Sequence, residues 1–239
     1  MITLPPLASL TEQRVNVMRD AAVMVVETAE SLAERGANAV SEALRDGEEF
    51  AEWNHYPAGD VLDKSTGAQY YYHSHNGAAD EHGHFHTFLR YQGIPDDISP
   101  VPHEGQNAKD WPDGKETITH LIAISMDHHG LPTHLFTTNR WVTAETVFAA
   151  EHAPVLLDNF AIAEDIGDRP ETNRWITGMV ALFRPQIEQL LVLRDEALAA
   201  RAAATVDKDE DVYEDHGVEI TSICEISIYD QLEWLELLE

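Results

Sequence analysis

Five of the 13 histidines lie close together in the sequence, in the segment HSHNGAADEHGHFH at positions 73–86. Imidazole nitrogens are common ligands of Zn, Fe, Cu, Ni and Mn, so such a cluster favours a divalent transition metal. The chain has a single cysteine, which argues against a thiolate zinc site or an iron–sulfur cluster. The segment therefore predicts a metal site with the candidate ligands His73, His75, His82, His84 and His86.

The spacing of these histidines suits a β-hairpin. Side chains two residues apart lie on the same face of a strand. His73 and His75 would then share a face, as would the three histidines of the next strand. A six-residue connection pairs His75 with His82 and His73 with His84, whereas a slip of one residue separates the two sets. The predicted site therefore depends on the register of the hairpin.

Carboxylates near the histidines supply further chemistry. Three protein ligands would leave a position on the metal open for water or substrate. Glu81, or one of Asp60 and Asp63 from the preceding segment, can act as a fourth ligand, as a partner that orients an imidazole, or as a general base toward a metal-bound water. We assign Glu81 as the candidate general base.

Two functions fit the histidine-rich segment. The first is a metal-binding protein, and more specifically a mononuclear metalloenzyme that acts on a small molecule. The second is an acidic, non-enzymatic interaction or stress protein whose histidines are solvated, or sense pH through mutual repulsion below about pH 6.5. The enzyme requires a pocket covered by the long loop 92–115, and the interaction protein requires an exposed apolar patch.

The elements expected around the hairpin are typical of an α+β fold with a mainly antiparallel sheet. N-terminal helices and a long C-terminal helix, interrupted at Pro185, flank the strands. A single domain, 1–239, is expected because no linker is found. The predicted helices are 11–36, 37–45, 143–152, 155–162, 172–204 and a short one at the C-terminus. The predicted strands are 69–75, 81–90, 118–126, 133–138 and 218–228, with turns over 53–67 and a surface loop over 92–115.

Composition restricts the partners. Lys and Arg number 15 against 43 Asp and Glu, a formal charge of −28, which disfavours nucleic acid and anionic lipid as partners. The sequence lacks both a membrane-spanning apolar stretch and a secretory signal, so a cytoplasmic protein is expected. We interpret the acidity as a solvated surface, with a DNA mimic, a cation sink and adaptation to a saline host as alternatives. A protein partner and a homo-oligomer both stay open.

Other candidate sites are weaker. The aspartates that begin at Asp207 imitate the start of a calcium loop, but Val212 and Val218 occupy the positions of its glycine and its bidentate glutamate. Cys224 is expected on the buried face of its strand, which argues against a nucleophile. Arginines are scarce, and three that could bind an anion are expected to form structural ion pairs instead. These three are Arg90, Arg140 and Arg174.

Several blocks of the sequence resemble an uncharacterised, mainly proteobacterial family of unknown function. The blocks are HYPAGD at 55–60, QYYYHSH at 69–75, EHGHFHTFLR at 81–90, SMD at 125–127 and LFTTNRW at 135–141. The resemblance covers most of the chain and implies no activity. His73, His75 and Glu81 are also superficially similar to a cupin motif. The spacing to Glu81 is one residue too long, however, and the following glycine is missing, so we do not assign a cupin.

Overall fold

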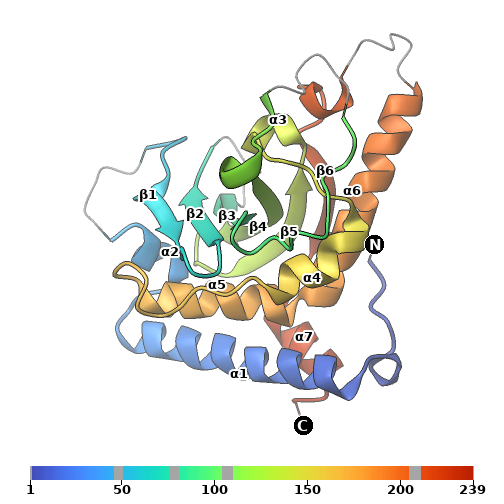
Figure 1. The fold of residues 1–239 in the computed structure, drawn as a ribbon. Coiled ribbons are helices and arrows are strands. Elements are labelled where there is room, and N and C mark those ends of the chain that lie inside the picture. The colour runs from blue at the N-terminus through green and yellow to red at the C-terminus, as the bar shows by residue number, and fades with distance from the viewer. Residues whose placement is uncertain (1, 46–50, 76–80, 104–109, 205–210, 239) are drawn as a thin grey trace.

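A six-stranded antiparallel sheet lies at the centre of the structure, and each strand pairs with its neighbours in chain order (Figure 1). The structure is a computed structural model that describes residues 2–45, 51–75, 81–103, 110–204 and 211–238. The strands are β1 (Tyr56–Leu62), β2 (Ala68–His73), β3 (Glu81–Arg90), β4 (Ile118–Asp127), β5 (Pro132–Thr138) and β6 (Ile220–Glu225).

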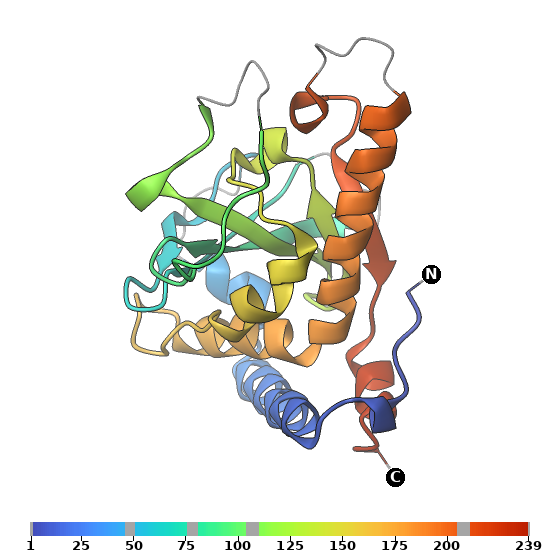
Figure 2. The ribbon, with the colours of Figure 1, turned by 45° about the vertical axis from the view of Figure 1, so that its right-hand side comes forward.

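Helices cover one face of the sheet and one of its sides. Helices α1 and α5 run side by side beneath the sheet, and α6 packs along β5 and β6 (Figures 1 and 2). Among the described residues, none of the helices combines the length and the apolar character that a bilayer crossing requires. The helices are α1 (Glu12–Glu34), α2 (Ala39–Ala43), α3 (Arg140–Thr143), α4 (Ala153–Asp158), α5 (Pro170–Leu182), α6 (Arg184–Ala204) and α7 (Ile228–Trp234).

The two faces of the sheet have different chemistry. One face carries the aromatic and aliphatic side chains of the core, such as Tyr70, Phe85 and Ile124, all fully buried. Phe85 meets Trp175 of α5, with ring centroids 5.9 Å apart. The opposite face carries histidines instead, among them His73 and His84. The strand period of two residues separates the hydrophobic core from the polar site in this way.

Most of the predicted layout is confirmed. The α+β class, the antiparallel sheet and the N-terminal helix, whose first turn is capped by the Thr11 hydroxyl, are as expected. The predicted interruption at Pro185 is also present, because α5 ends at Leu182 and α6 begins at Arg184. The connection 76–80 of the hairpin lies outside the described residues.

Two predicted elements are wrong. The turn segment 53–67 contains strand β1, whose register shifts between Tyr56 and Val61. This is an edge strand, so Pro57 is tolerated there even though proline disrupts central strands. The predicted helix 143–152 is also absent over 144–149. There the Thr146 amide donates to the Ile118 carbonyl, which ties the segment to the start of β4.

Candidate metal centre

The β2–β3 hairpin has the register that brings the predicted ligands together. His73 lies opposite His84, and their Nε2 atoms are 2.7 Å apart. Both side chains are buried, with exposed fractions of 7% and 3%. His75 follows β2, and its ring centroid is 5.2 Å from that of His73 and 5.0 Å from that of His84. One nitrogen from each of the three lies within 4.8 Å of the others. We call these three residues the histidine triad.

His86 lies beside the histidine triad on the same face of β3. Its ring centroid is 4.8 Å from that of His84 and 5.0 Å from that of His73. The side chain is fully buried, and its Nδ1 is 2.9 Å from Nε2 of His120 on β4. Its Nε2 has no hydrogen-bond partner among the described residues. His86 is thus a buried neighbour of the triad with one nitrogen still unsatisfied.

His82 does not share a face with His84 and His86, so this expectation is wrong. Its Nδ1 lies 2.6 Å from the hydroxyl of Tyr72, whose side chain belongs to the core, and its ring meets that of His128 edge-on. The cause is a bulge: the pairing of β3 with β4 shifts between Glu81 and Gly83. The extra residue reverses the side-chain alternation before Gly83.

The same bulge brings Glu81 to the histidine triad. In a regular strand, residues three apart lie on opposite faces. Here Glu81 Oε1 is 2.9 Å from Nδ1 of His84. Burial opposes ionisation of Glu81, but hydrogen bonds from His84 and Ser125 outweigh it and hold the pKa of the carboxyl below its usual value. An ionised Glu81 accepts the Nδ1 proton of His84 and leaves the Nε2 lone pair directed at His73.

Burial also keeps neighbouring imidazoles neutral. Burial, with a smaller effect of the nearby His84, His75 and His55, lowers the pKa of His73 to about 3. Burial is likewise the main cause of the lowered pKa of His75 and of the strongly lowered pKa of His86. Because only the neutral imidazole has a lone pair for a metal ion, this environment favours the ligating form.

Asp60 and Asp63 do not contact the histidine triad. Asp60 accepts a hydrogen bond from Gln69 and pairs with His55, whose ring centroid is 5.8 Å from that of His73. Asp63 accepts from Ser65 and from the amide of Ala163, so it organises the turn after β1. Of the three carboxylates considered, Glu81 is the one in contact with a triad histidine.

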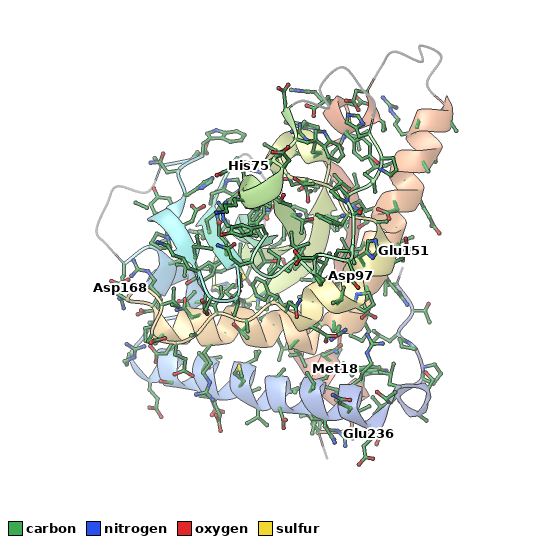
Figure 3. All side chains as sticks on the ribbon, in the orientation of Figure 1. Met18, His75, Asp97, Glu151, Asp168 and Glu236 are labelled. Carbon is green, nitrogen blue, oxygen red and sulfur yellow. The ribbon has the colours of Figure 1, made fainter. Side chains whose placement is uncertain are left out.

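A cavity of about 740 Å³ opens beside the triad and is lined by His75, Glu81, His84 and His86. In Figure 3, side chains surround the labelled His75 beyond the end of β2. The described part of the loop 92–115 contributes no lining residue, so the expected cover is not found there. The far wall comes instead from β4, β5, β6 and the residues next to them. These include Ser125, Asp127, His134, Phe136, Thr138, Val142, Glu219, Ile220, Ile223 and Glu225.

Two buried polar residues near the site could not be found from spacing. His120 is remote in sequence from the hairpin, and only the β3–β4 register, which places it opposite Phe88, brings it to His86. Glu145 accepts the backbone amide proton of His120, and burial raises the pKa of this carboxyl to about 7. Two of the three arginines, Arg140 and Arg174, form the expected ion pairs, with Glu214 and Glu27. Arg90 instead donates a hydrogen bond to the side-chain oxygen of Gln69.

The sequence pattern of a domain of unknown function, DUF6969, matches residues 19–226. The chain belongs to this family. The match includes all six strands, and with them the histidine triad and Glu81. Comparison with curated proteins and with solved structures found no match. Membership of DUF6969 confirms the resemblance to an uncharacterised family, and it assigns no activity, so a function has to be argued from the site.

The close approach of β2 to Gly83 of β3 can be tested by Gly83→Ala. A Cβ atom there would lie 2.5 Å from the carbonyl oxygen of His73 and 2.5 Å from the hydroxyl oxygen of Tyr72, so β2 and β3 would have to part. We expect the free energy of unfolding to fall by about 2–3 kcal/mol, as for other overpacked sites, in urea denaturation. A value within about 0.5 kcal/mol of wild type would show that the close approach is absent.

Burial of His120 predicts acid sensitivity of the metal-free protein. Burial, then Arg194 and His84, lowers its pKa to about 3, whereas the unfolded chain takes up a proton near pH 6.5. Stability is therefore lost as pH falls below 6.5, by about 2 kcal/mol per such histidine at pH 5. In His120→Asn, the loss between pH 7 and pH 5, measured by urea denaturation, should be smaller by about that amount.

The exposed His129 provides the matched control for this experiment. His129→Gln should leave the pH dependence unchanged. The effect of Glu145 on stability has the opposite sign, because its raised pKa makes the folded protein take up a proton as pH falls toward 5. Its contribution is common to all three proteins and cancels in the comparison. An equal loss of stability in wild type and His120→Asn would contradict the prediction.

Proposed function

We propose that the protein binds one divalent transition metal ion through His73, His75 and His84, and that the ion acts on a small molecule in the adjoining cavity. The observation that carries the proposal is the convergence of three imidazole nitrogens within 4.8 Å of one another, two of them on buried side chains. Buried polar groups are normally paired, and three histidines facing one another have few partners except a proton or a metal ion.

The spacing of the triad suits an ion after a small adjustment. The 2.7 Å between the Nε2 atoms of His73 and His84 is a hydrogen-bond distance. Bonds of about 2.1 Å in a tetrahedral site place ligand nitrogens roughly 3.4 Å apart, so the rings would need to part by less than about 1 Å. His75, beyond the end of β2 and less buried than the other two, has the freedom to complete the set.

The ligand chemistry restricts the metal. An all-imidazole triad suits Zn, Fe, Cu, Ni or Mn, whereas Ca²⁺ and Mg²⁺ prefer oxygen ligands. Three protein ligands leave a coordination position free, and the cavity lies on the side from which a small molecule would reach it. The metal would supply Lewis acidity there.

Glu81 has two proposed roles. Its contact with Nδ1 of His84 makes it a positioning residue that fixes the ring and its tautomer. Because it also lines the cavity, the same carboxylate is placed to accept a proton from water or from a bound molecule as a general base. The positioning role requires only the observed contact with His84. The general-base role also requires a water or bound molecule that gives up a proton.

An acidic interaction or stress protein is the second candidate function. The charge of −28 favours it, as do exposed apolar side chains such as Trp53 and Tyr229, each 65% exposed. Solvated histidines, which this candidate requires, are not observed at His73, His84 or His86, because all three are buried. The two candidates differ in whether the protein retains a metal.

Elemental analysis by mass spectrometry tests the metal site. Untagged protein purified without chelators should carry close to one transition-metal ion per chain, and His84→Ala should carry almost none. His82→Ala is the matched control and should retain the metal, because His82 contacts Tyr72 instead of the triad. Should His84→Ala fail to fold, His75→Ala removes a less buried ligand. Metal-free wild type that also fails to bind added Zn²⁺ in calorimetry would overturn the proposal.

Substitution Glu81→Gln separates positioning from ligation. The amide cannot accept the Nδ1 proton of His84 as strongly, so Zn²⁺ affinity in calorimetry should fall by about 10- to 100-fold while the stoichiometry stays at one. Asp60→Asn removes a nearby carboxylate that pairs with His55, outside the triad, and should leave the affinity unchanged. Equal affinity in wild type and Glu81→Gln would remove Glu81 from the site.

A further inference from the structure

The cavity beside the triad is acidic. Four of the described side chains that line it are carboxylates, namely Glu81, Asp127, Glu219 and Glu225, and none of the described lining residues is Lys or Arg. Glu81 is engaged with His84, and Asp127 accepts the amide protons of the turn after β4. Glu219 approaches Nε2 of His75 at 3.7 Å, and its side chain is 48% exposed. Glu225 forms no ion pair within the described part of the chain. Two carboxylates are therefore available to a ligand.

A buried atom independently indicates a ligand. Nε2 of His86 is shielded from solvent without a hydrogen-bond partner in the described residues, and His86 lines the cavity. Leaving such a nitrogen unsatisfied costs free energy. In the tautomer whose Nδ1–H donates to His120, Nε2 is an acceptor, and the N–H group of an ammonium would satisfy it.

The lining of the cavity also has an apolar part. Ile220 and Ile223 line it although they are 45% and 53% exposed, and Phe136 packs edge-on against His84 with ring centroids 5.1 Å apart. Large apolar side chains left exposed at a cavity commonly contact the apolar part of a ligand. The volume of about 740 Å³ is in the usual range for small-molecule sites.

We infer that the cavity binds a small organic cation, an ammonium group attached to an apolar portion. The carboxylates of Glu219 and Glu225 would attract the ammonium, and Ile220, Ile223 and Phe136 would contact the apolar portion. An anion of the same size is disfavoured, because the described lining of the cavity holds no Lys or Arg that would offset the carboxylates. The inference rests on the proposed function in that the bound cation would lie next to the metal held by the triad.

Three probes of matched size test the charge preference: 2-phenylethylammonium, 2-phenylethanol and 3-phenylpropanoate. Their binding is measured by calorimetry and by NMR on chelator-treated protein and on Zn²⁺-loaded protein, so that coordination of an amine to the metal is seen separately. We expect the ammonium to bind at least about tenfold more tightly than the carboxylate, with the alcohol between them and with binding weakened by salt.

The double variant Glu219→Gln/Glu225→Gln should weaken ammonium binding by about threefold to tenfold. Glu196→Gln, on the exposed side of α6 and away from the cavity, is the matched control and should bind as wild type does. Equal or tighter binding of the carboxylate, no binding of the ammonium in either form of the protein, or an unaltered double variant would overturn the inference.

These measurements distinguish failure of the proposed metal site from failure of the proposed cation site. If Zn²⁺ binds with one ion per chain and the ammonium does not bind, the inference about the cation falls and the metal site stands. If the ammonium binds to chelator-treated protein with the expected selectivity and no metal binds in any preparation, the cation site stands and the proposed function falls.

Discussion

The pairing of His73 with His84 across β2 and β3 is the constraint on which the rest of the site depends. Backbone hydrogen bonds of the hairpin set this register, and the two Nε2 atoms meet at 2.7 Å because of it. A slip of one residue would turn one imidazole into the hydrophobic core, which the aromatic residues already fill. Tyr72 and Phe85 lie opposite each other on the core side of the sheet and fix the same register. The packing of the hydrophobic face therefore also fixes the positions of the histidines on the other face.

A single irregularity of β3 decides which residues join this pair. The bulge between Glu81 and Gly83 turns His82 toward Tyr72 and brings the carboxylate of Glu81 to Nδ1 of His84. A regular β3 would have placed its three histidines on one face with Glu81 on the other. The bulge exchanges one candidate ligand for an orienting partner, which is the usual environment of a ligating histidine.

The cavity depends on a contact between distant parts of the chain. Strand β6, which follows α6, pairs with β5 and extends the histidine face of the sheet by Ile223 and Glu225. Helix α6 packs along both strands and fixes this addition (Figure 2). Part of the acidic and apolar lining, from Glu219 to Glu225, thus comes from a segment far in sequence from the triad, whose three residues lie close together in the sequence.

The sequence by itself determined the α+β class, the antiparallel hairpin and the candidate ligands that include His73, His75 and His84, because strand alternation is a local property. It left open the hairpin register on which their convergence depends. Only the tertiary structure decided the rest. The bulge that displaces His82 arises from pairing with β4, and the contact of His86 with His120 arises from the same pairing. Periodicity along one strand carries no information about its neighbour's register, so neither the exchange of His82 for Glu81 nor the cavity wall was predictable from the histidine spacing.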